Sequence, residues 1–168
     1  MGMNELIAAG SAVAPCAAWG MARAIDFQQD AAPLEMWLRG VLTDDAPPAD
    51  IQTLWFDLHE ELGAARAFAF TFLGTTEQGP PDPAQGILFW SPEQSRAPSR
   101  VLELLGATLV ADDDATRFAR YVLPLGFAVL MLTQLFARVG PTLALGEREH
   151  RYLAVGYDSE DYLLLEPF

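Results

Sequence analysis

The sequence predicts an α+β fold in which an antiparallel β-meander and a C-terminal β-hairpin pack against several helices, one of them strongly apolar. Three patterns predict it: alternating apolar residues over 53–74, an apolar run over 121–137, and two short apolar runs around a polar turn near the C-terminus. At 168 residues and 51% apolar composition, the chain has the size and hydrophobicity of one domain with its own core. We therefore expect residues 1–168 to form a single domain.

The N-terminal part predicts helix. Residues 1–30 indicate one or two short helical turns. Asp30 is placed to cap a helix that has Pro33 in its first turn and continues through residue 42. The apolar residues of this segment recur at helical spacing: Leu34, Trp37, Leu38, Val41 and Leu42. The polar segment 43–50 ends the helix.

The clearest strand pattern follows. Residues 53–61 alternate between an apolar and a mixed face, with Leu54, Phe56 and Leu58 on the apolar side. Residues 66–74 repeat the alternation, and 86–92 supply a third short apolar run after a loop rich in Gly and Pro. Three strands in sequence predict the antiparallel meander. A helix beginning at Ile51 is the alternative for the first segment.

The C-terminal half predicts two further helices and the hairpin. Ser99 can cap a short helix over 100–106, and the segment 107–110 is a strand or a loop. Asp112–Asp114 can cap a helix over 115–122, after which Pro124 fits the first turn of a separate helix that is apolar on all sides. The apolar run has the minimum length of a membrane span and is interrupted by polar residues, so we expect a core helix. The turn 158–161 joins the strands of the final hairpin.

Charge narrows the class of partner. The chain has 23 acidic residues against ten basic ones, all arginine, and a formal charge of −13. Such a field repels nucleic acid and anionic membranes, so we expect neither as a partner; it favours encounter with a basic protein. Solubility alone is the other explanation of the acidity. A single cysteine, Cys16, and the absence of a basic residue before Arg23 favour the cytoplasm over secretion.

The sequence contains no complete motif for catalysis or for metal binding. His59 and Glu60 resemble the start of a zinc-protease motif, but Gly63 stands where the second histidine is needed. Asp112–Asp114 lacks the ligand spacing of a calcium loop. We therefore expect no metal, no cofactor and no catalytic residue. The alternative is a small enzyme whose acid–base groups are His59 or His150 with nearby carboxylates.

Two acidic segments are the candidate partner-binding residues. In the first strand, an exposed tryptophan lies beside polar residues and a carboxylate-rich turn; this segment comprises Trp55, Asp57, His59, Glu60 and Glu61. The final hairpin turn supplies Asp158, Glu160 and Asp161. An aromatic anchor within a field of carboxylates is typical of a surface that binds a basic protein.

Residues 51–92 resemble the front half of small acidic bacterial immunity-type proteins. The shared pattern is a strand with an aromatic pair, a hairpin, a Gly/Asp/Pro loop and an aromatic strand end; the loop departs from it in having only Glu77 and Asp82 as acids. The resemblance implies a cytoplasmic protein that neutralises a bacterial toxin, often a basic one. Other hypotheses are a secretion chaperone or adaptor, the small enzyme, and a DNA mimic, which would need regular rows of acids.

Overall fold

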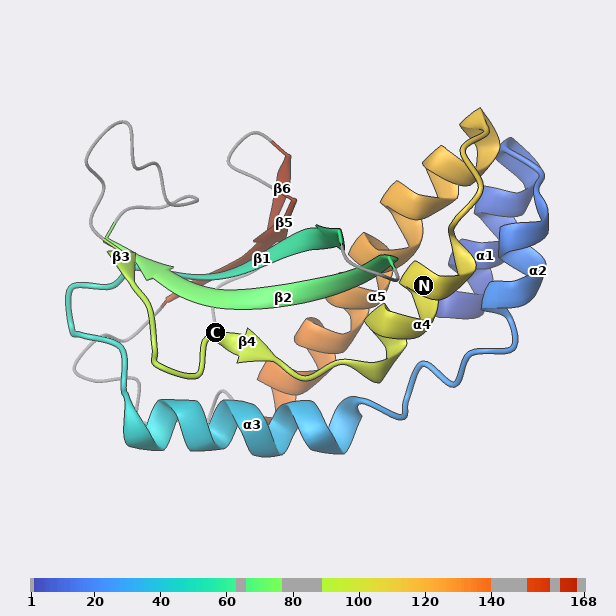
Figure 1. Cartoon of the computed structure of the whole chain (residues 1–168). Coiled ribbons are helices and arrows are strands. Elements are labelled where there is room, and N and C mark those ends of the chain that lie inside the picture. Colours follow the sequence, from blue (N-terminus) through green and yellow to red (C-terminus); the bar gives the residue numbers. More distant parts are fainter. Residues whose placement is uncertain (1, 63–65, 77–88, 140–150, 158–160, 166–168) are drawn as a thin grey trace.

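The computed structural model describes residues 2–62, 66–76, 89–139, 151–157 and 161–165 (Figure 1). It confirms the α+β fold. Within the described residues, the helices and strands are α1 (Met3–Val13), α2 (Ala17–Ala22), α3 (Ala31–Asp44), β1 (Thr53–Leu62), β2 (Arg66–Thr75), β3 (Phe89–Trp90), β4 (Arg96–Ala97), α4 (Arg100–Thr108), α5 (Asp114–Val139), β5 (Tyr152–Gly156) and β6 (Tyr162–Leu165).

The strands form one mixed sheet in the order β3-β2-β1-β5-β6, with β4 paired to the far side of β2. The meander is confirmed, because β1 pairs antiparallel with β2, and β2 with β3. The C-terminal hairpin is confirmed by antiparallel pairing of β5 with β6. It completes the sheet by parallel pairing of β5 with β1. Parallel neighbours need a long crossover, which here runs through β2, β3, β4, α4 and α5.

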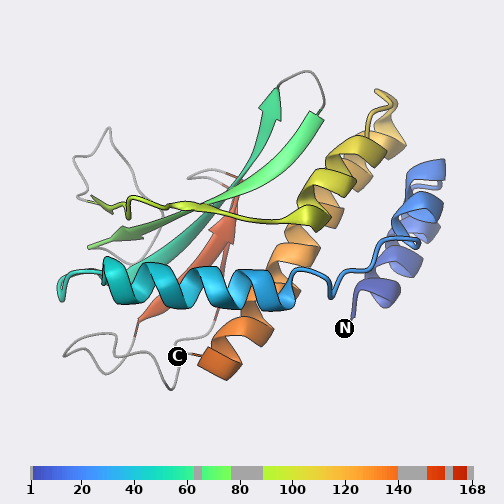
Figure 2. The same ribbon diagram turned by 60° about the horizontal axis from the view of Figure 1, so that its bottom comes forward.

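The strand alternation separates the sheet into two faces. Leu54, Phe56 and Leu58 of β1 are fully buried and lie on what we call the helix face. Phe56 stacks on Phe72 of β2 and meets Trp37 of α3 and Phe136 of α5 edge-on. Helices α3 and α5 therefore cover this face, as Figure 2 shows from below. We call the opposite side of the sheet the outer face.

Helix α1 is longer than predicted. Instead of one or two turns, it spans eleven residues. Its start is stabilised by a hydrogen bond from the Gly2 main-chain nitrogen to the Glu5 carboxylate, 2.8 Å long. Gly10 lies so close to the ring of Trp19 in α2 that a Cβ there would overlap it. Helix α1 thus depends on tertiary packing, which a single sequence pattern does not reveal.

Helix α5 corrects the prediction of two helices. It is a single 26-residue helix with Pro124 in its interior. Proline has no N–H to donate to the carbonyl four residues earlier, which belongs to Arg120. The phenol of Tyr157, just beyond β5, donates instead to the carbonyls of Arg120 and Tyr121, at 3.2 and 2.9 Å. Burial raises the pKa of this phenol, so it remains a protonated donor.

Helix α5 is enclosed along its middle: every residue from 122 to 132 is buried or half-buried, and its exposed residues lie toward the two ends. Phe127, Leu132 and Leu135 are fully buried, whereas Leu130 is half-buried and lines a cavity beside the 23–28 loop. The prediction of a core helix is therefore confirmed for the middle of α5, whereas the two ends of the helix each have an exposed side. Among the described residues, α5 is the one helix long and apolar enough to cross a membrane, and half of its most apolar stretch is buried inside the fold. A core helix of a soluble protein has this property.

We expect Tyr157→Phe to lower the free energy of unfolding by about 1–2 kcal/mol, because it removes the donor that serves the Arg120 carbonyl but keeps the ring stacked on Tyr121. In a Pro124→Ala background, the new N–H of residue 124 can serve that carbonyl. The same substitution should then cost less than half as much. Urea denaturation of the four proteins measures this, and equal losses in both backgrounds would disprove the proposed role of Tyr157.

Candidate functional site

The outer face brings three of the predicted site residues together. Asp57, His59 and Glu61 occupy successive outward positions of β1, because side chains on a strand alternate between its two faces. Each is about a third exposed. Their inward neighbours on β1 include Phe56 and Leu58, which the helices cover. The alternation therefore keeps these three polar side chains in contact with solvent.

His59 lies between the two carboxylates. Its Nδ1 is 3.5 Å from the Asp57 carboxylate and 3.4 Å from the Asp57 carbonyl oxygen. Its Nε2 is 3.9 Å from the Glu61 carboxylate. The imidazole thus lies between two carboxylates along the strand.

The structure adds Arg96 to this row of polar side chains, although the sequence did not indicate it. It lies on β4, where it is opposite Thr71 of β2, which in turn is opposite Asp57. Its guanidinium is 2.6 Å from the Glu61 carboxylate and is well exposed. We call Asp57, His59, Glu61 and Arg96 the outer-face cluster. A two-residue strand before Pro98 has no periodicity, so nothing local predicts that Arg96 joins β2.

Two predicted residues of β1 are placed differently from expectation. Trp55 is on the outer face but is only 2% exposed, because Tyr162 of β6 packs edge-on against it. It is therefore not the exposed anchor that we predicted. Glu60 points to the helix face, opposite Phe68 of β2, and its charge contributes to raising the pKa of Tyr157. Adjacency in sequence put Glu60 beside Glu61, but the pleat separates them.

The second predicted segment lies mostly outside the described residues. This holds for Asp158 and Glu160, and for His150 of the enzyme hypothesis. Asp161 is described and exposed just before β6, and its carbonyl accepts a hydrogen bond from the Tyr157 nitrogen, 3.1 Å long. Asp161 is followed by Tyr162, whose ring packs on Trp55 of the first segment.

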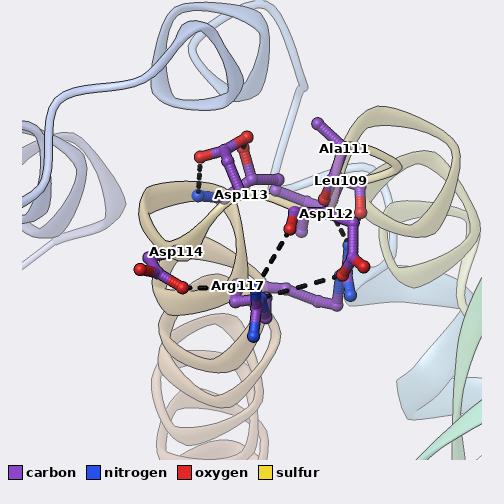
Figure 3. A network of polar contacts seen from close by, with 8 residues as sticks. Leu109, Ala111, Asp112, Asp113, Asp114 and Arg117 are labelled. Carbon is purple, nitrogen blue, oxygen red and sulfur yellow. Dashed lines mark hydrogen bonds and ion pairs between the residues drawn. The ribbon is translucent and has the colours of Figure 1, made fainter.

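The run Asp112–Asp114 acts as a helix start, as predicted (Figure 3). The Asp113 carboxylate accepts hydrogen bonds from the nitrogen and hydroxyl of Thr116, at 2.9 and 2.7 Å, and these bonds hold the pKa of Asp113 below its ordinary value. Arg117 lies 3.7 Å from Asp112 and 3.2 Å from Asp114. These three carboxylates are thus engaged within the fold and are not gathered around a common point.

The outer-face cluster offers charged groups for ion pairing. No group of three or more His, Cys, Asp or Glu in the described part of the chain is arranged to hold a metal ion. A cavity of about 310 Å³ lies beside the cluster, between β2 and the start of α4, and Arg96 is among its lining residues while His59 is not.

No family model, curated protein or solved structure matches this chain.

Proposed function

We propose that this chain is a protein-binding module, most concretely a cytoplasmic immunity protein that neutralises a basic bacterial toxin. One observation carries the proposal: the carboxylates of the outer-face cluster are held in a row on a sheet face, within a chain of charge −13. The resemblance of residues 51–92 to immunity-type proteins is consistent with it. A secretion chaperone or adaptor is the nearest alternative and would use the same surface.

The cluster suits a transient ion-pair exchange. Arg96 neutralises Glu61 in the free protein, and both side chains are substantially exposed. An exposed pair of this kind contributes only about 0.2–1 kcal/mol to stability. A guanidinium or ammonium group of a partner can therefore displace Arg96 at low cost, or add to it beside Asp57. The surrounding field speeds the encounter.

The small-enzyme alternative depends on His59, whose two flanking carboxylates can orient an imidazole for proton transfer. The two functions differ in one readout. A binding module keeps its partner affinity within a few fold when His59 is replaced by Gln, which retains the polar surface. An enzyme loses turnover with the same change.

The test uses the product of the adjacent reading frame. We expect it to arrest bacterial growth and this chain to relieve the arrest. Stopped-flow association of the two purified proteins should slow by about tenfold or more between low and physiological salt, with dissociation much less affected. A product without toxicity, or an arrest that the chain does not relieve, would contradict the toxin assignment.

Charge reversal on the outer face should slow that association by about tenfold. The variant is Asp57→Lys/Glu61→Lys, and its matched control is Asp44→Lys/Asp50→Lys, which makes the same change in net charge at exposed positions near the end of α3. The control should alter the rate by about twofold or less at physiological salt. If both double variants slow association equally, total charge rather than the outer-face cluster directs the encounter.

A further inference from the structure

Strand β6 is an edge strand of the described sheet. It ends the sheet order at one side, and no other described strand pairs with its far edge. Natural edge strands are commonly shielded by charges, prolines or bulges. The four residues of β6 are Tyr162, Leu163, Leu164 and Leu165, and Leu163 and Leu164 are 46% and 40% exposed. An apolar, exposed edge of this kind is the feature that strand addition requires.

The hydrogen-bond pattern shows which groups point to that edge. The Tyr157 nitrogen donates to the Asp161 carbonyl, so this opposed pair is a hydrogen-bonded one. Such pairs alternate along antiparallel strands, which makes Val155–Leu163 and Leu153–Leu165 hydrogen-bonded as well. Tyr152 bonds to Gln52 on the other side of β5, in agreement with this parity. The N–H and C=O groups of Tyr162 and Leu164 therefore point away from β5, along the outer edge.

Charge selects the occupant. Residues 152–168 include Asp158, Glu160, Asp161 and Glu166 and no basic residue. A second copy of this chain would bring Asp161, which is exposed just before β6, and a net charge of −13 against its own edge. A segment rich in Lys or Arg would instead be attracted to it.

We propose that β6 docks an extended segment of a partner, whose main chain pairs with Tyr162 and Leu164 and whose side chains are basic and apolar in alternation. This inference rests on the proposed function in naming a basic protein as the partner. The added strand lies beside Tyr162 and Leu164 on the outer face, next to buried Trp55, and beside Leu163 and Leu165 on the helix face. Main-chain pairing supplies affinity, and the alternating side chains supply selectivity.

The experiment uses the whole chain and a ten-residue peptide of alternating Lys and Val. Its controls are the same peptide N-methylated at every residue, which keeps the charge but loses the donors, and a peptide with Glu in place of Lys. Isothermal titration calorimetry should detect binding of the Lys–Val peptide and should detect no binding of either control peptide. Failure of the Lys–Val peptide to bind, or equal binding of the N-methylated peptide, overturns the proposal.

Two protein variants locate the binding. Leu164→Pro removes an N–H that points away from β5, a position where proline is tolerated in an edge strand. Leu164→Ala keeps that N–H and trims the same side chain. We expect a loss of affinity of tenfold or more for Leu164→Pro and of about threefold or less for Leu164→Ala. Equal affinities of Leu164→Pro and the wild-type chain overturn the proposal.

A measurement on the wild-type chain removes the dependence on folding of the proline variant. Peptide binding should slow amide hydrogen exchange at Tyr162 and Leu164, with little change at Leu163 and Leu165, which already donate to β5. Unchanged exchange at Tyr162 and Leu164 overturns the proposal. A self-association that Leu164→Pro abolishes would assign the edge to a second copy instead. The peptide assay needs no toxin. Binding at the β6 edge can therefore be confirmed even if the growth test fails, and the growth test can succeed even if the peptide does not bind.

Discussion

Phe56→Ala is expected to lower the free energy of unfolding by about 3–5 kcal/mol. Phe56 is fully buried in β1 and its ring contacts those of Trp37, Phe70, Phe72 and Phe136. These side chains come from α3, β2 and α5, so the cavity left by alanine would be walled by three separate elements. Such a site collapses poorly, and the cost lies at the upper end of the large-to-small range.

Urea denaturation followed by tryptophan fluorescence measures the loss. The control is Phe118→Ala on α5, where the ring is 38% exposed and its centroid lies 6.2 Å from that of Trp19. We expect the control to cost about 1 kcal/mol or less. A loss at Phe56 as small as at Phe118 would mean that the sheet and the helices α3 and α5 do not share one core.

The alternation around Phe56 is also what made the sheet predictable. It assigned β1 and β2 correctly, and it placed Asp57 and His59 on one face of the first strand. The same rule separates Glu60 from Glu61, yet the predicted binding segment contained both because they are adjacent in the chain. The placement of Glu60 beside Glu61 on one surface was therefore wrong, and the sequence already contained the information to correct it. Strict use of the strand period would have put it on the helix face.

Other features depend on contacts between distant segments. Trp55 has polar neighbours on its face of β1, which predicts exposure, but the C-terminal hairpin adds Tyr162 beside it. Pro124 predicts a helix start, but Tyr157 supplies the donor that lets α5 continue. Arg96 reaches the outer-face cluster through a two-residue strand. Each of these depends on which strand or helix lies next to which, and local periodicity carries no information about that.

Asp30 is a further case, since its side chain acts elsewhere than predicted. It occupies the N-cap position of α3 but makes no side-chain cap there. Its carboxylate, 2% exposed, instead accepts hydrogen bonds from the Ser99 hydroxyl at 2.5 Å and from the nitrogens of Arg100 and Val101 at 3.0 Å. Ser99 caps α4 as expected by accepting from Leu102, 3.1 Å away. The start of α4 is therefore held by a residue about 70 positions earlier in the chain.

We expect Asp30→Ala to lower the free energy of unfolding by about 3 kcal/mol or more, because it leaves buried N–H and hydroxyl donors of the α4 start without their acceptor. Asp30→Asn keeps one side-chain oxygen and should lose about half as much.

Ser99→Ala tests the network: its cost added to that of Asp30→Ala should exceed the cost of the double variant by about 1 kcal/mol, since the two side chains serve the same helix end. Chemical denaturation of the wild-type chain and these variants gives these values, and far-ultraviolet circular dichroism shows whether α4 frays. Additive losses, or an Asp30→Ala loss below about 1 kcal/mol, would mean that the α4 terminus is satisfied by water and that Asp30 does not join the starts of the two helices.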